Sequence, residues 1–300
     1  MFRKKSLLWH FQLMRKIALS LLLIMPSLSL AHSKVPCSLE RKLANIQLIT
    51  FDLYAALSES ASSVTRNITS ILKSKKLTPA QIKQFTDTWF SNYSTTKNYN
   101  GYIQSTSVAK MVGVQHFQLF DMMLKSTLTY TIRSLSFTKN LKFSQSDIAS
   151  MMNAWDKLTP LPGTIGALKK LQQAGYKLAI LSNGSRQRIQ DVINNEGYQG
   201  IFSYIISSSS VNRFKPDPKI YAEVMEKTHL NKDQILHVAG AGFDAIGSRA
   251  FGYLTAWNNV NHVELLNSLL SKRYEPNIVL DNLSELPDIM AQSHLACTTG

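Results

Sequence analysis

Short apolar runs and longer amphipathic stretches follow one another along this chain. The segment 46–51 is apolar and β-branched and ends at Asp52, which predicts a buried strand. Beyond residue 160, runs of helical period alternate with short buried runs. The predicted helices are 164–174, 186–196, 218–228 and 245–252, and the predicted strands are 176–181, 201–207, 235–238 and 254–257. Strands that alternate with helices in this way predict a parallel sheet covered on both faces.

The stretch between the first strand and the alternating region is richer in polar residues and helix signals. Thr78 followed by Pro79 predicts a helix start that Thr78 caps. Prolines and a glycine near residue 160 then mark a boundary. We therefore expect an α/β core over 32–58 and 156–300, with 59–155 inserted after the first strand as a helical cap. The serine run 207–210 is expected to form a loop.

The amino-terminal segment 1–31 predicts a secretory signal. It holds five basic residues and no acid, an apolar run over 17–30, and small residues before a cleavage point after Ala31. The apolar run is shorter than the roughly 20 residues that span a bilayer as a helix. An uncleaved anchor and a buried helix are the alternatives. The prediction is an exported protein, periplasmic or secreted, that meets a membrane only through this segment.

Composition and charge narrow the functional classes. Of 300 residues 44% are hydrophobic, which excludes a disordered chain. The net charge is +14, or +9 without segment 1–31, but the basic residues are scattered and form no stripe interleaved with aromatics. Nucleic-acid binding is therefore not expected. The charge is either a solvated cationic surface or a field that steers small anions to a cleft.

Cysteine and histidine usage gives no metal site. Two cysteines, Cys37 and Cys297, exclude a disulfide scaffold and a four-cysteine zinc site, and their pairing stays open. The histidines, His237 among them, show no ligand spacing and are expected to be structural or at the surface.

Polar residues gather after several predicted strands, at the edge where active groups of parallel sheets lie. The segments are Phe51-Asp52-Leu53-Tyr54, Leu181-Ser182-Asn183-Gly184-Ser185, Phe214-Lys215-Pro216-Asp217-Pro218 with Tyr221, and Phe243-Asp244-Ala245 with Gly247. Together they resemble the haloacid dehalogenase superfamily, and within it the bacterial (S)-2-haloacid dehalogenases, also called type II. The resemblance implies a Rossmann-like core with a helical cap and hydrolysis of small 2-halocarboxylates without a metal or other cofactor. Members often form dimers, so a homodimer is an open expectation.

The resemblance assigns roles to eight residues. Asp52 would attack the substrate and form an ester that water cleaves, and Lys215 would keep it ionised. Tyr221 and Asp244 would orient Lys215 and the hydrolytic water. The substrate-binding residues would be Ser182 and Asn183, which hold its carboxylate, and Tyr54 and Phe243, which wall the pocket.

The sequence departs from that family at several positions. Where the family has Gly-Thr after the first tyrosine and Ser-Ser-Asn before the fourth motif, this chain has Ala55-Ala56 and Ala239-Gly240-Ala241. Phe90 follows Trp89 where the family has an arginine, which phenylalanine cannot replace as an anion binder. Arg66 and Arg133 are the candidates to supply that charge from elsewhere in the cap.

These departures keep two alternatives open. One is a catalytically decayed fold that binds a small anion or a partner protein. The other is a magnesium-dependent phosphatase of the same superfamily, which would need a second aspartate two residues after the nucleophile to protonate an alkoxide leaving group. Tyr54 stands at that position, and Asp244 is the only acid within 239–250, so the phosphatase is disfavoured. A halide leaving group needs no proton.

Overall fold

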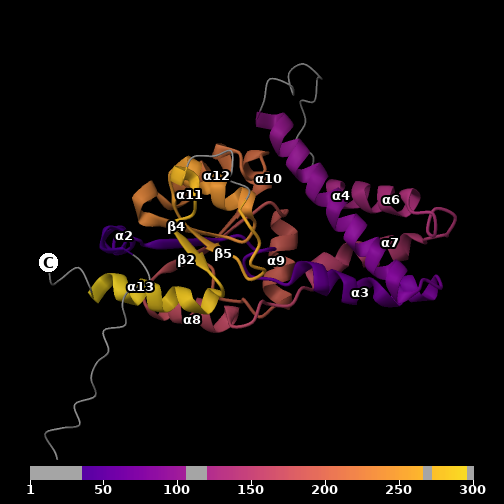
Figure 1. Cartoon of the computed structure of the whole chain (residues 1–300), viewed down its shortest axis with the longest axis horizontal. Coiled ribbons are helices and arrows are strands. Elements are labelled where there is room, and N and C mark those ends of the chain that lie inside the picture. Colours follow the sequence, from indigo (N-terminus) through magenta and orange to yellow (C-terminus); the bar gives the residue numbers. More distant parts are fainter. Residues whose placement is uncertain (1–35, 106–119, 266–271, 296–300) are drawn as a thin grey trace, which may run out of the picture. The chain divides into compact units, whose positions relative to one another are not determined.

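The computed structural model describes residues 36–105, 120–265 and 272–295, with side chains up to residue 93 in the first range and to residue 293 in the last. Its centre is a parallel six-stranded sheet of order β3-β2-β1-β4-β5-β6 (Figure 1). The strands are β1 (Leu48–Phe51), β2 (Lys177–Ser182), β3 (Tyr204–Ser207), β4 (Ile235–Ala239), β5 (Leu254–Asn258) and β6 (Ile278–Leu280). The parallel sheet predicted from the alternating pattern is confirmed.

Helices cover both faces of this sheet, as Figure 1 shows. α8 (Thr164–Gln173) and α13 (Leu286–Leu295) lie on one face, and α11 (Pro218–Thr228) and α12 (Gly242–Phe251) lie on the other. The core also includes α2 (Cys37–Leu43), α9 (Arg186–Asn195), α10 (Ser208–Val211) and the short 3-10 helices η2 (Lys232–Gln234), η3 (Lys272–Tyr274) and η4 (Leu283–Glu285).

The strands are buried because their apolar side chains alternate between the two covered faces. Ile49 and Phe51 of β1 join the large cluster under α8 and α13, whereas Leu48 joins the cluster under α11. The two-residue period of a strand puts Thr50 and Asp52 on the same face as Leu48. Polar groups of β1 therefore face the side of the sheet where α11 lies.

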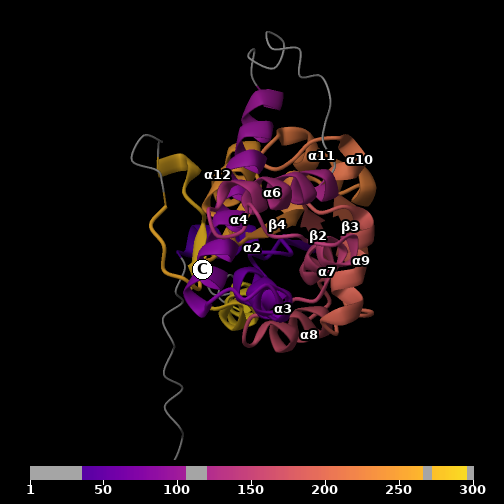
Figure 2. The same ribbon diagram turned by 90° about the vertical axis from the view of Figure 1, so that its right-hand side faces the viewer.

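The segment between β1 and β2 is helical, as expected of a cap. It consists of α3 (Ser60–Ser74), α4 (Pro79–Ser105), α6 (Phe120–Ser134), α7 (Gln145–Asn153) and the 3-10 turn η1 (Ala154–Asp156). These helices pack on one another beside the sheet, as Figure 1 shows, and they lie in front of it in the view of Figure 2. The predicted start of α4 is confirmed, because Thr78 Oγ1 accepts from the Gln81 amide at 3.3 Å and the Thr78 amide donates to Gln81 Oε1 at 2.9 Å.

The α/β fold with an inserted helical segment is therefore confirmed. The compact unit that holds all described residues spans Val35–Gly300, so cap and core belong to one unit, and the limits 32–58, 59–155 and 156–300 stay a prediction. The predicted signal segment 1–31 and Cys297 lie outside the described residues, and Cys37 is exposed. Within the described parts of the chain, none of the helices combines the length and apolar character needed to cross a bilayer.

Two local expectations are corrected. The serine run forms a helical turn rather than a loop, because Ser207 Oγ accepts from the Ser209 amide at 3.2 Å and caps it. The helix expected from residue 245 begins at Gly242, so Phe243 and Asp244 lie in its first turn. β6 has no counterpart among the predicted strands, since three residues are too short a run to show a period.

Candidate active site

A cavity of about 300 Å³ opens at the carboxyl ends of β1, β2 and β4, and we call it the Asp52 cavity. This is the edge where a parallel sheet of this topology collects its functional groups. The cavity is lined by Asp52, Tyr54, Ala55, Ser60, Phe90, Tyr93, Trp155, Asn183, Ala241 and Phe243. Four of the eight predicted site residues, Asp52, Tyr54, Asn183 and Phe243, thus meet in one space.

Asp52 directly follows β1 and is held in place by its neighbours. Its amide donates to the Val238 carbonyl of β4 at 2.9 Å, which continues the sheet pairing by one residue. Its Oδ2 accepts from the Ala55 amide at 3.1 Å, and its Oδ1 accepts from Lys215 Nζ at 2.8 Å. The residue is 8% exposed, and that remaining surface faces the cavity. The carboxylate is therefore oriented, ion-paired and accessible to a small molecule.

Lys215 is buried between two carboxylates. Its Nζ donates to Asp52 Oδ1, to Asp244 Oδ2 at 2.6 Å and to the Leu181 carbonyl at 3.0 Å. Three donors thus have three acceptors, which is what a buried ammonium needs. Burial lowers the pKa of Lys215, but the charges of Asp244 and Asp52 outweigh burial and raise it above the ordinary value. The ammonium therefore stays charged beside Asp52.

Asp244 is fully buried and has a donor on each side. Besides Lys215, Tyr221 Oη donates to its Oδ1 at 2.8 Å and His237 Nε2 lies 3.1 Å from its Oδ2. Burial raises the pKa of Asp244, yet Lys215 and His237 together hold it well below its ordinary value. Asp244 does not line the Asp52 cavity. Its contacts show how it positions Lys215.

His237, which the sequence predicts only as a structural or surface residue, also belongs to this polar cluster. It is buried in β4 opposite Thr50 of β1, and its Nδ1 lies 2.9 Å from Thr50 Oγ1. Thr50, His237 and Asp244 thus form a polar chain that ends on Lys215. Histidine in an otherwise apolar strand was the available signal, because a buried polar side chain needs partners.

Asn183 and Ser182 are placed differently. Asn183 Oδ1 accepts from the Lys215 amide at 2.8 Å, so the side chain anchors the lysine segment and its amide nitrogen remains as a donor at the cavity wall. Ser182 is fully buried; its Oγ accepts from the Gly184 amide at 3.1 Å, and it does not line the cavity. The serines of α10 support this turn, with Ser208 Oγ donating to the Asn183 carbonyl at 2.7 Å.

The cap contributes an aromatic wall. Trp155 is its centre, with ring centroids at 4.8 Å from Phe90 and 5.2 Å from Tyr93. Tyr54 and Phe120 stack at 5.3 Å beside it. Trp155 Nε1 is buried without a hydrogen-bond partner among the described residues. Tyr93 and Trp155 were not identified from the sequence, because aromatic residues at helical spacing look the same whether they fill a core or face a ligand.

The cap supplies no cation to the Asp52 cavity among the residues whose side chains are described. Arg66 Nη2 donates to Ser63 Oγ and Thr159 Oγ1, and Arg133 is exposed on α6; neither lines the cavity. Arg188 is bound to Asp121 and Asp156. In the same described set, no three His, Cys, Asp or Glu side chains are placed to hold a metal ion.

Two glycines allow the close contacts around the site. A Cβ on Gly240 would lie 2.1 Å from the Ala55 carbonyl carbon, so the loops after β4 and β1 touch through their backbones. A Cβ on Gly247 would lie 2.4 Å from Pro216 Cβ and 2.9 Å from Tyr221 Oη. Glycine at 240 is thus a packing requirement of this loop, which explains why a serine is absent there.

Comparisons with known proteins identify the family and agree with the fold. The family model described as haloacid dehalogenase-like hydrolase matches residues 82–257, which is more than half of the chain but begins after Asp52. Haloacetate dehalogenase H-2 of Moraxella sp. (strain B) is 38% identical over 43% of this chain and 59% of its own length. An (S)-2-haloacid dehalogenase of Pseudomonas putida is 26% identical over 83% of this chain and 98% of its own.

A solved structure supports the fold. The L-2-haloacid dehalogenase from Xanthobacter autotrophicus aligns with a TM-score of 0.64 at 24% identity, covering 82% of this chain and 98% of that one. With the sheet order, the inserted helices and the family match over 82–257, the chain belongs to the haloacid dehalogenase-like hydrolase family.

Proposed function

We propose that this protein hydrolyses the carbon–halogen bond of small 2-halocarboxylates through an ester of Asp52. The observation that carries the proposal is the Asp52–Lys215 ion pair of 2.8 Å at the wall of the Asp52 cavity. A carboxylate that is oriented, kept ionised and open on one side is suited to attack carbon. The dehalogenases similar to this chain give the substrate class.

The proposed reaction has two steps. An Asp52 oxygen forms a bond to carbon 2 of the substrate while the carbon–halogen bond breaks and halide leaves with the electron pair. Water then adds to the Asp52 carbonyl carbon, the bond to the product oxygen breaks, and a 2-hydroxycarboxylate and one proton are released. The sum is one halide, one hydroxy acid and one proton for each water consumed.

The residues around Asp52 take separate parts in this scheme. Lys215 balances the charge of the free carboxylate, and Asp244 with Tyr221 holds Lys215 in place. The free amide nitrogen of Asn183 donates to the substrate carboxylate at the cavity wall. Ser182 supports the same turn, and its direct contact with substrate stays a prediction.

The halide leaves toward the aromatic wall. Ring edges carry partial positive charge, and an apolar surface takes up a large, weakly hydrated anion more readily than a small one. The unpartnered Trp155 Nε1–H is a donor that a departing halide would satisfy. Aromatic residues of the cap would thus do part of what the arginine does in the similar enzymes.

A halide-release assay tests the proposal. The full chain incubated with monochloroacetate or 2-chloropropionate should release halide, and Asp52→Asn should lose at least about 10⁴-fold in rate, as removal of a nucleophile does. Asp288→Asn, an exposed aspartate away from the cavity, is the matched control and should keep the rate.

A second candidate is a catalytically decayed fold that binds a small anion or a partner protein. Among the described side chains no cap cation lines the cavity, and this observation favours the second candidate, together with Ala56 and Ala241. If wild type and Asp52→Asn release no halide and bind a small carboxylic acid equally, this candidate replaces the enzyme.

We further propose that the protein is exported through segment 1–31. The basic start, the apolar run and the small residues before Ala31 support this. Amino-terminal sequencing of the protein from its own cells should give a chain that begins after Ala31; an intact segment 1–31 would contradict export with cleavage.

A further inference from the structure

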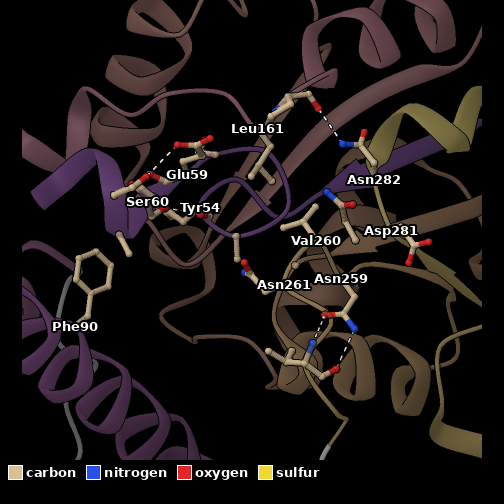
Figure 3. A pocket seen from close by; sticks show the side chains of 18 residues that line it. Tyr54, Glu59, Ser60, Phe90, Leu161, Asn259, Val260, Asn261, Asp281 and Asn282 are labelled. Carbon is tan, nitrogen blue, oxygen red and sulfur yellow. Dashed lines mark hydrogen bonds between the residues drawn. The ribbon is translucent and has the colours of Figure 1, made fainter. Parts of the chain in front are cut away.

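A second hollow adjoins the Asp52 cavity. This cleft, of about 660 Å³, shares Tyr54, Ala55, Ser60 and Phe90 with the Asp52 cavity and extends to the ends of β5 and β6. Figure 3 shows Phe90 on one side and Asn282 on the other, with Asn259 and Asn261 between them. Four residues wall both spaces, so the cleft lies directly beside the Asp52 cavity.

The chemistry of this asparagine cleft differs from that of the Asp52 cavity. Asn258, Asn259, Asn261 and Asn282 line it together with serine hydroxyls. Its charged lining residues are Glu59 and Asp281, and no lysine or arginine among the described residues lines it. Arg66 Nη1 lies 3.8 Å from Glu59 and His262 Nδ1 lies 3.6 Å from Asp281, but neither basic residue lines the cleft. An anionic group would therefore meet carboxylates at the cleft wall itself.

Two amides of the cleft have unused hydrogen-bonding capacity. Asn258 is 1% exposed; its Nδ2 donates to the Ala56 carbonyl at 2.8 Å, while its buried Oδ1 has no partner. The Asn261 side chain makes no hydrogen bond within the described residues. Buried acceptors are normally satisfied, so Asn258 Oδ1 marks a place for a donor.

The other amides of the cleft are already engaged. Asn259 Nδ2 donates to the Val263 carbonyl at 2.9 Å, and Asn282 Nδ2 donates to the Pro162 carbonyl at 3.2 Å. These contacts fix the rim, so the cleft is held open by its own hydrogen bonds. Asn258 and Asn261 are left to contact a ligand.

We propose that this cleft is a second subsite, which selects 2-halocarboxylates with an uncharged, hydroxyl-bearing tail and disfavours those with a second carboxylate. The inference rests on the proposed function and names its substrate class. The reacting end occupies the Asp52 cavity, and the hydroxyl of the tail donates to Asn258 Oδ1 and accepts from Asn261.

Three bromo acids of one chain length test this. We expect kcat/KM for 2-bromo-6-hydroxyhexanoate to exceed that for 2-bromohexanoate about thirtyfold, since two added hydrogen bonds contribute about 1 kcal/mol each. 2-Bromoadipate, with a second carboxylate, should be the poorest of the three. Asn261→Ala should reduce the hydroxyl preference, and Asp281→Asn should raise the relative rate for 2-bromoadipate. Asn140→Ala, an exposed asparagine of the cap, should leave both ratios as in wild type.

Equal kcat/KM for the hydroxyl and alkyl probes, or a hydroxyl preference that Asn261→Ala does not reduce, would overturn the subsite. If no probe releases bromide, the proposed function fails instead. The affinities of 6-hydroxyhexanoate, hexanoate and adipate, measured by calorimetry, then test the subsite independently of the reaction. Tighter binding of the hydroxy acid supports the subsite, and equal binding counts against it.

Discussion

The two walls of the Asp52 cavity are built on opposite principles. Behind Asp52 on the sheet side lies a chain of charged and polar groups in which Lys215 and both Asp244 oxygens have partners. The wall from the cap is aromatic, and its buried Trp155 N–H has no partner. Polar groups that all have hydrogen-bond partners are held in one fixed arrangement, whereas a donor without a partner in an apolar wall has capacity to bind a ligand.

The difference between the two walls helps to place the positions at which this sequence departs from the family pattern. The partners of Asp52, the proposed nucleophile, are present on the sheet side. Of the changed positions, Phe90 lies in the aromatic cap wall, whereas Ala56 and Ala241 lie in the loops that follow β1 and β4. We infer that activation of Asp52 is retained and that recognition has changed.

The largest effect is expected from Lys215→Met. This change removes the cation between two buried carboxylates. Loss of one partner of a buried ion pair typically costs about 3–5 kcal/mol, so we expect the free energy of unfolding to fall by about 4 kcal/mol. Urea unfolding measures it. Lys83→Met, which breaks the exposed Lys83–Asp87 pair, is the control and should leave stability close to wild type. Equal effects of the two changes would contradict the buried pair as the centre of the sheet wall.

Glu196 provides a contrast to the paired carboxylates, because its partners are hydroxyls. Ser58 Oγ donates to it at 2.9 Å, and burial raises its pKa to about 7. The folded protein then binds a proton that the unfolded chain releases near its ordinary value, so this contribution to stability is present in acid and lost as pH rises through about 7. Glu196→Gln should be more stable than wild type by about 3 kcal/mol at pH 8.

The measurement is the difference in unfolding free energy between Glu196→Gln and wild type from pH 4 to 8. The difference should grow with pH, and exposed Glu226→Gln should show no such slope. A difference that does not depend on pH would show that Glu196 is ionised throughout.

His237→Phe should cost about 1–3 kcal/mol, because Thr50 and Asp244 each lose a buried partner. It should also raise the pKa of Asp244 toward its ordinary value. Since a lowered carboxylate pKa stabilises the fold above the ordinary value and the effect is lost in acid, the variant should unfold at a higher pH during acid titration. His237→Gln, which keeps a donor, should recover part of both losses; no recovery would make His237 a packing residue only.

The smallest expected effect is at the cap wall. Trp155→Phe removes the unpartnered N–H and should raise the inhibition constant for product bromide about fivefold, the equivalent of about 1 kcal/mol for one hydrogen bond. Trp89→Phe is the matched control, because Trp89 Nε1 already donates to the Leu124 carbonyl at 3.3 Å and Trp89 does not line the cavity. An unchanged constant in Trp155→Phe would remove the tryptophan from halide binding.

Much of the sheet could be predicted because the buried strands and the helix caps leave local signals. The run that ends at Phe51 and the run Lys177–Ser182 are short, continuous and largely apolar, as buried strands are, and Thr78 and Pro79 mark a helix start. β6 and the helix in the serine run could not be predicted, because three to four residues are too few to show a periodicity. The helix in the serine run depends instead on its cap, the Ser207 side chain.

The candidate site, too, could be predicted only in part from the sequence. The motifs predicted which polar residues follow the strands, and the sheet brings them together. The partnership of His237 with Asp244 depends on the register of β1 and β4, and the place of Trp155 depends on how the cap packs. Neither relation is encoded by neighbours in sequence.

Isotope transfer in a single turnover tests the central claim most directly. The enzyme, in excess over 2-chloropropionate, is incubated in ¹⁸O-water, and both the hydroxy acid and the peptide that contains Asp52 are analysed by mass spectrometry. The Asp52 ester predicts one ¹⁸O in Asp52 and none in the product, because water attacks the carbonyl carbon of the ester. Label in the product and none in Asp52 would contradict it.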